Sequence, residues 1–131
     1  MRTQDLLETR GVVSGDSALL RLAGELDMAS APLLPRAVTG CLGPDLRRLY
    51  VDVAALTFCD AAGIRALHAA RRTALAHNAA FALVGVHRRL RRILLLYGAG
   101  VLLGPTWQDA VKVRAAQPAT GVPPAVSRAL R

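Results

Sequence analysis

The sequence predicts an α/β fold with a mixed, largely parallel open sheet of about five strands and about four helices. Two observations lead to this expectation. Short apolar runs of strand length alternate along the chain with longer segments of helical periodicity, as in sheets whose parallel strands are joined by crossover helices. The first two runs are separated only by Gly15-Asp16, a turn that reverses the chain and makes one edge antiparallel. The expected order is β-β-α-β-α-β-α-β-α.

The first elements are a hairpin and an irregular helix. Residues 11–24 should form the two short strands that flank the turn. The helix begins after Asp27 or Ser30, because either side chain can accept hydrogen bonds from the free N–H groups of a first helical turn. Gly43-Pro44 should end this helix.

A central strand and a long helix follow. The strand covers residues 47–53, with Leu49, Val51 and Val53 on one face, and a loop covers residues 54–60. From residue 61 the small and apolar residues recur at helical spacing, so one side of this helix should be buried. The buried side is formed by Gly63, Leu67, Ala70 and Ala74, with Ile64 and Leu75 at its edge. The solvated side carries Arg65, His68 and Arg72.

The remaining elements are a strand, a helix, a short strand and a final helix. The first strand covers residues 80–86. In the next helix, four arginines face solvent opposite an apolar stripe that consists of Leu90, Ile93, Leu94 and Tyr97. Residues 101–104 are expected to form the last short strand, and residues 106–113 the last helix.

One domain should cover residues 1–113, followed by a disordered tail over residues 114–131. The tail contains prolines and small residues without apolar periodicity, so it cannot offset an ordering cost of about 1 to 2 kcal/mol per residue. We therefore predict that truncation after Val113 leaves the thermal midpoint of unfolding unchanged, as measured by circular dichroism. A large drop in the midpoint would show that the tail packs against the domain.

The net charge of +8 raises nucleic-acid binding as a function. The arginines are concentrated in residues 87–92 and in the tail, and no expected helix combines them with the Asn or Gln side chains that read bases. We therefore expect no specific nucleic-acid binding. The most apolar run, residues 93–104, is too short to span a bilayer, so we expect a cytoplasmic protein without membrane insertion.

The residue patterns of common enzymes and metal sites are lacking. The sequence has neither a nucleophile elbow nor a phosphate-binding glycine loop that ends in lysine. Cys41 and Cys59 have no metal-ligand spacing, and neither have the three histidines. Asp27 and Asp60 could form the carboxylate pair of a glycosidase, but the sequence around them supplies no sugar-binding aromatic residues. We expect no catalysis, no metal and no cofactor.

The stretch "FCDAAGIRAL", residues 58–67, places very small side chains where the long helix begins. Asp60 is positioned to cap this helix. Ala61 and Ala62 then lie in its first turn, beside the positive end of the helix dipole. On this stretch alone, the small residues fit a surface for a partner or a helix start selected for packing.

Neighbouring stretches of the sequence favour a partner surface over a helix start selected for packing. "GELD" at residues 24–27, "VDV" at residues 51–53 and the D-x-x-G-I block at residues 60–64 together resemble the STAS domain. This family contains bacterial anti-sigma factor antagonists and the tails of sulphate transporters. The resemblance covers about residues 10–113 and implies a mixed sheet with helices packed against it, which agrees with the order of elements above.

The resemblance also implies a regulatory switch from which this chain departs. In antagonists of the family the second block is usually Asp-Ser-Ser-Gly, and the partner anti-sigma factor, a kinase, phosphorylates one of the serines. The matching residues here are Asp60, Ala61, Ala62 and Gly63, so neither hydroxyl is present and no phosphorylation site is expected at Ala61 or Ala62. Asp27 matches an aspartate that lies near the phosphorylation site in the family.

By this resemblance the chain is a non-enzymatic regulator that binds a serine-kinase-like anti-sigma factor. The expected partner-binding residues are Asp27, Asp60, Ala61, Ala62, Gly63, Ile64 and Arg65. One alternative is an adaptor subunit of a larger assembly, such as a lipid-transport complex or a signalling scaffold. Another is a small-molecule or nucleotide binder, for which no residue argues. A homodimer stays open.

Overall fold

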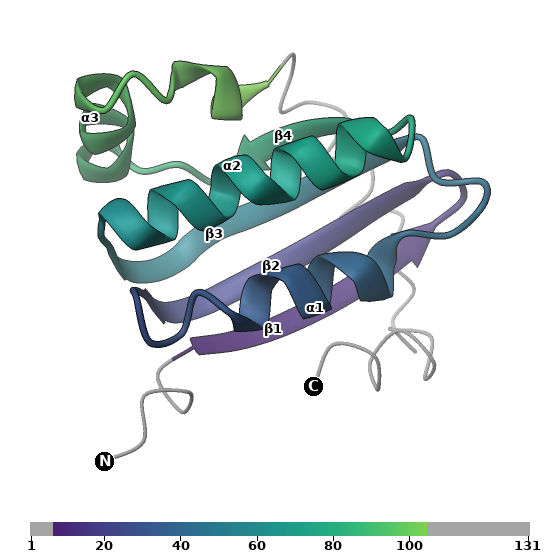
Figure 1. Ribbon diagram of the computed structural model, residues 1–131, viewed down its shortest axis with the longest axis horizontal. Coiled ribbons are helices and arrows are strands. Elements are labelled where there is room, and N and C mark those ends of the chain that lie inside the picture. The colour runs from purple at the N-terminus through teal and green to yellow at the C-terminus, as the bar shows by residue number, and fades with distance from the viewer. Residues whose placement is uncertain (1–6, 105–131) are drawn as a thin grey trace.

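Four strands form the sheet in the order β1-β2-β3-β4 within residues 7–104, the part of the chain that the computed structural model describes (Figure 1). The strands are β1 (Leu7–Ser14), β2 (Ser17–Leu26), β3 (Arg48–Cys59) and β4 (Ala80–Val84). β1 is antiparallel to β2, whereas β3 and β4 run parallel to β2. Ser14 pairs with Ser17 across the predicted turn, and Gly15 has the positive φ of +61° that such turns require. The predicted fold class is confirmed.

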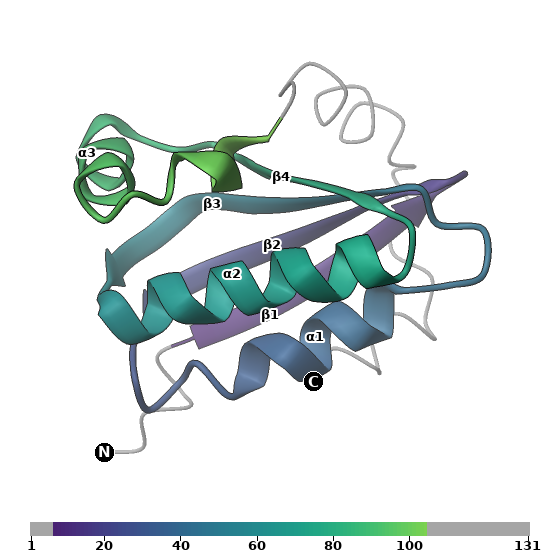
Figure 2. The ribbon, with the colours of Figure 1, turned by 45° about the horizontal axis from the view of Figure 1, so that its top comes forward.

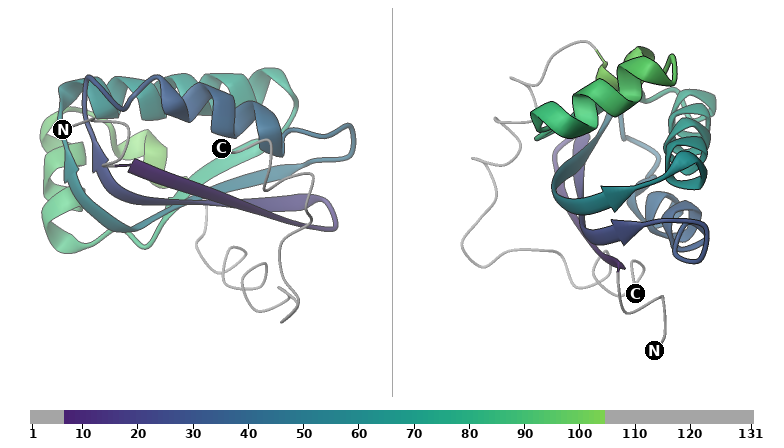
Figure 3. Two further views of the ribbon diagram at one scale, coloured as in Figure 1. Left: turned by 90° about the horizontal axis from the view of Figure 1, so that it is seen from below. Right: turned by 90° about the vertical axis from the view of Figure 1, so that its left-hand side faces the viewer.

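Over residues 7–104, three α-helices and one short 3₁₀ helix accompany the sheet. They are α1 (Leu33–Cys41), α2 (Ala61–Ala76), α3 (Arg88–Leu96) and the 3₁₀ helix η2 (Gly100–Leu103). The connections β2-α1-β3 and β3-α2-β4 step across the sheet in the same direction, so connections of one hand place both helices on the same face. Figures 2 and 3 show α1 and α2 side by side on that face, while α3 lies beyond the β4 side of the sheet.

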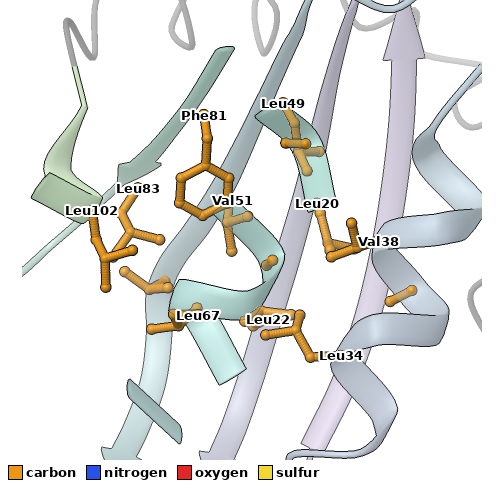
Figure 4. Packing of buried hydrophobic residues seen from close by; sticks show 14 of the residues in the cluster. Leu20, Leu22, Leu34, Val38, Leu49, Val51, Leu67, Phe81, Leu83 and Leu102 are labelled. Atoms are coloured by element: carbon orange, nitrogen blue, oxygen red, sulfur yellow. The ribbon is translucent and has the colours of Figure 1, made fainter. Parts of the chain in front are cut away.

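The main hydrophobic core lies between the sheet and helices α1 and α2 (Figure 4). Its fully buried side chains include Leu20, Leu22, Leu34, Val38, Val51 and Leu67. Successive strand residues point to opposite faces, so the neighbours of these core residues form a second, small cluster of Leu19, Tyr50, Ala82 and Val84 on the other face. Apolar residues on both faces explain why the strand at residues 47–53 alternates only partly in sequence.

The predicted loop at residues 54–60 is wrong over most of its length, because β3 continues to Cys59. The register between β2 and β3 shifts twice, between Arg21 and Ala23 and between Gly24 and Glu25. Such bulges break the alternation of apolar residues, so the strand pattern fades in sequence although the pairing goes on. The extension brings the ends of β2 and β3 together, since Leu26 pairs with Cys59.

The helical stripe of α2 is confirmed, with Gly63, Leu67, Ala70 and Ala74 buried. Ile64 is also buried, whereas Leu75 is 44% exposed. Arg71, a charged residue on the stripe side of α2, is half-buried and lines a cavity of about 380 Å³ together with Phe81 and Val101. The stripe of α2 therefore faces an open hollow at this position, where the guanidinium group can reach solvent.

The predictions for the segment after β4 need two corrections. Leu90 and Leu94 of α3 are buried as expected, but Tyr97 is 59% exposed and does not belong to the stripe. Residues 101–104 form no strand, because the chain turns into η2, which buries Leu102 in the core and packs Leu103 against it. Three consecutive apolar residues fit a strand or a helical turn equally well, so periodicity could not decide between them.

The expected helix at 106–113 and tail at 114–131 lie outside the described residues, as does part of the expected domain of residues 1–113. Within residues 7–104, none of the helices has the length and apolar character needed to cross a bilayer.

Candidate functional site

A tight turn at the end of β2 holds the end of the GELD block, and Asp27 organises this turn. One carboxylate oxygen of Asp27 accepts hydrogen bonds from the backbone N–H groups of Ala29, at 3.0 Å, and Ser30, at 2.9 Å. The fully buried Ser30 hydroxyl donates to the carbonyl of Glu25, at 2.7 Å, and accepts from the N–H group of Asp27. These bonds fix the turn, which leaves Met28 76% exposed at its tip.

Asp27 and Ser30 do not cap α1, so that expectation is corrected. The N-cap residue of α1 is Pro32, which makes no side-chain capping hydrogen bond. Both side chains instead satisfy the backbone of their own turn, a common alternative for Asp and Ser. The backbone N–H groups of Leu33 and Leu34, the first residues of α1, donate hydrogen bonds to the carbonyls of residues 30 and 31.

The second block forms the start of α2, with Asp60 as its cap as predicted. Asp60 has an extended backbone conformation, and its carboxylate accepts from the N–H group of Gly63 at 2.9 Å. Its carbonyl accepts from Ile64, the first bond of the helix, at 2.9 Å. Ala61 and Ala62 lie between these anchors with partly exposed side chains. We call the surface of Asp27–Ser30 and Asp60–Ala62 the helix mouth.

Gly63 brings the two blocks of the helix mouth into contact. A Cβ atom built on Gly63 would lie 2.4 Å from the carbonyl oxygen of Leu26 and 2.9 Å from the sulfur of Cys59. The same carbonyl of Leu26 accepts a hydrogen bond from the N–H group of Asp60. Only glycine allows α2 to start this close to the ends of β2 and β3. The Gly in the D-x-x-G block therefore has a structural reason.

The structure separates the expected partner-binding residues into surface and support. Asp27, Asp60, Ala61 and Ala62 are partly exposed, and Arg65 is exposed one turn further along α2. Gly63 is buried, and Ile64 is 4% exposed and packs in the main core. Gly63 and Ile64 therefore cannot offer side-chain surface to a partner, and their role at this site is to hold the helix mouth in place.

Two exposed apolar residues, one in the helix mouth and one near it in sequence, were not predicted as site residues. Met28 lies at the tip of the Asp27 turn, and Phe58, at the end of β3, is 49% exposed. Phe58 also lines a cavity of about 220 Å³ between the end of β3 and α3, together with Leu56, Cys59, Leu90 and Ile93. The signal was the aromatic residue two positions before Asp60, which the predicted loop placed off the sheet.

The cysteines are poorly reactive in this environment. Burial raises the pKa of the Cys59 thiol to about 11, with a further contribution from the negative charge of Asp60. Burial alone raises the pKa of Cys41 to about 12. Both thiols are therefore protonated at neutral pH. They react slowly, because the thiolate is the nucleophile. Within residues 7–104, no three His, Cys, Asp or Glu side chains gather in a way that could hold a metal ion.

The Asp27 turn gives the protein a testable acid sensitivity. The Ser30 N–H group lowers the pKa of the Asp27 carboxyl below its ordinary value, against an opposing effect of lost hydration. A lowered pKa in the folded state stabilises the fold above the unfolded value of about 3.9, and this stabilisation is lost as the pH falls through the folded value. We predict that Asp27→Asn loses less stability than the wild type between about pH 5 and pH 3. Urea unfolding over this range measures the difference; superimposable pH profiles would contradict it.

Comparisons with known proteins agree with this geometry. A family model described as "Mlab, STAS domain" matches residues 12–104. An anti-sigma factor antagonist from Mycobacterium paratuberculosis has a similar structure, with a TM-score of 0.68, 26% sequence identity, and coverage of 84% of this chain and 96% of that chain. No protein with a curated description matches the sequence.

Two further solved structures share the fold at lower identity. The STAS domain of an antisigma-factor antagonist from Rhodobacter sphaeroides has a TM-score of 0.53 and 23% identity, with 61% of this chain and 87% of that chain covered. The Bacillus cell fate determinant SpoIIAA in its phosphorylated form has a TM-score of 0.57 and 18% identity, with 81% and 96% covered. With a family model that spans both β2 and η2, the chain belongs to the STAS domain family and resembles its anti-sigma factor antagonists.

Proposed function

We propose that the protein is a non-enzymatic antagonist that binds an anti-sigma factor through the helix mouth and thereby releases a sigma factor. The observation that carries the proposal is the rigid pairing of the two blocks, in which Asp27 and Asp60 hold their turns and Gly63 brings them together. A pre-formed surface binds without a large ordering cost. The similar structure of the antagonist from Mycobacterium paratuberculosis supports this class of partner.

The composition of the helix mouth suits a protein partner. Ala61 and Ala62 present only small side chains at the free N–H end of α2, and Met28 and Phe58 are exposed in the turn after β2 and near the end of β3. Apolar anchors surrounded by polar groups are typical of the energetic centre of a protein interface. Arg65 adds an exposed charge at the rim.

The alanines determine how such binding is regulated. A phosphate in the first turn of α2 would add about −1.5 to −2 charges and repel a partner that fits the neutral surface. Ala61 and Ala62 have no hydroxyl group to accept it. The complex is therefore constitutive, or controlled by the amounts of the two proteins.

Recovery of the partner tests the proposal. The full chain, immobilised and exposed to extract of its native host, should retain a serine-kinase-like anti-sigma factor, and Ala62→Asp should retain clearly less of it. If the one protein recovered is a membrane ATPase, the result would instead support an adaptor subunit of a larger assembly. The absence of switch hydroxyls favours this second candidate to the same degree, because a structural subunit needs a permanent contact.

We also predict the outcome of a phosphorylation assay with the anti-sigma partner and ATP. The wild type should gain no phosphate in the α2 turn, whereas Ala61→Ser or Ala62→Ser should accept phosphate if the partner has kept its kinase activity. Mass spectrometry locates the group. Phosphate on Ser30 or Thr57 with loss of binding would contradict the constitutive complex. Ser30 is fully buried, so its hydroxyl is not presented to a kinase, whereas Thr57 is exposed and donates to the carbonyl of Gly24 at 3.2 Å.

A further inference from the structure

The acidic and basic residues of the described chain are segregated. Residues 61–104 contain seven arginines and no aspartate or glutamate. Four of these arginines, Arg88, Arg89, Arg91 and Arg92, are exposed on α3. Within residues 7–104 the ion pairs are those of Arg21 with Asp52 and Arg48 with Asp16, so the α3 arginines have no acidic partner there. Cations at the start of a helix oppose its dipole, and no acid in the first turn compensates them.

Large apolar side chains are exposed directly after these arginines. Leu95, Leu96, Tyr97 and Val101 are 57%, 77%, 59% and 49% exposed. A Cβ atom on Gly100 would lie 3.4 Å from a methyl carbon of Leu95, so the end of α3 and the start of η2 are adjacent. We call these four residues and the four arginines the α3 patch. It lies at one end of the molecule, beyond the β4 side of the sheet (Figures 1 and 3).

The spacing on α3 places the charged and apolar parts of the patch on one outward stripe. Arg88, Arg92 and Leu96 are separated by four residues each and therefore follow one another along one side of the helix. The opposite side carries the buried Leu90 and Leu94. Along this stripe, the first turn and a half of α3 is basic and its last turn is apolar.

We propose that the α3 patch binds the surface of an anionic lipid bilayer without crossing it. Arginines attract acidic headgroups while their aliphatic stems lie along the apolar boundary, and Leu and Tyr side chains enter the interface between headgroups and acyl chains. Charge alone would suit any polyanion. The exposed Leu95 and Leu96 favour a bilayer, because a phosphate backbone offers them no apolar environment.

Sedimentation of the full chain with vesicles tests this proposal. Binding should be strong to vesicles of phosphatidylglycerol mixed with phosphatidylcholine, weak to phosphatidylcholine alone, and reduced by salt. Each basic residue at an anionic surface is worth roughly a five-fold factor in partitioning, so Arg91→Gln combined with Arg92→Gln should weaken binding roughly 25-fold. Arg10→Gln combined with Arg36→Gln removes the same charge from exposed positions of β1 and α1 and should weaken it far less.

The apolar part of the patch has its own matched pair. Leu96→Ser should weaken vesicle binding about ten-fold. Met28→Ser removes a side chain of nearly the same exposure, 76% against 77%, from the helix mouth and should leave it unchanged. Circular dichroism confirms that each variant is folded. No binding to the anionic vesicles would overturn the proposal. It would also be overturned if Leu96→Ser bound like the wild type while a DNA duplex or polyglutamate competed fully, since the patch would then be a polyanion site.

Discussion

Replacing Gly63 with alanine should lower the free energy of unfolding by about 1 to 3 kcal/mol or more, because the new methyl group overpacks a closed site. It would lie 2.4 Å from the carbonyl oxygen of Leu26 and 2.9 Å from the sulfur of Cys59. The sulfur can rotate away, but the carbonyl belongs to a backbone that is held by the N–H group of Asp60. The start of α2 would have to move away from the strand ends, and the helix mouth would open.

Urea unfolding followed by circular dichroism measures this loss, and Gly43→Ala provides the matched control. Gly43 lies between α1 and β3, and a Cβ atom built there meets nothing within 4 Å. A surface change of this kind alters stability by less than about 0.5 kcal/mol. Equal stabilities of the two variants would contradict the close approach of α2 to Leu26.

The fold was predictable where local chemistry and periodicity agree. The Gly15-Asp16 turn, the cap at Asp60 and the buried stripe of α2 each rest on contacts within a few residues, and all three are confirmed. The end of β3 was not predictable, because its pairing depends on a strand far away in sequence and on bulges that disturb the alternation. The predicted strand at residues 101–104 was wrong for a related reason, since an uninterrupted apolar run has no period.

The site shows the same division. The two aspartates and the glycine could be selected from motif spacing, and the structure gives each of them a local role. Burial of Ile64 and exposure of Phe58 depend on how α2 and β3 pack against the rest of the chain, so the spacing of the motif could not reveal either. A motif thus identifies the location of a surface better than the side chains that form it.

Introducing an acid into the first turn of α2 should weaken the complex with the anti-sigma factor by more than about 1 kcal/mol, or roughly five-fold in affinity. In Ala62→Asp or Ala61→Asp the new carboxylate must lose hydration when the partner covers it. Neither variant should unfold, because an acid near the start of a helix interacts favourably with the dipole. Ala76→Asp, at the exposed last position of the same helix, adds the same charge at the end remote from the helix mouth and should bind normally.

Titration calorimetry with the purified anti-sigma factor tests most directly whether the helix mouth is the docking surface. We expect wild type and Ala76→Asp to bind with equal affinity, and Ala61→Asp and Ala62→Asp to bind at least about five-fold more weakly, with all four proteins equally folded by circular dichroism. Equal affinity of all four proteins would contradict the proposal and place the interface elsewhere on the domain.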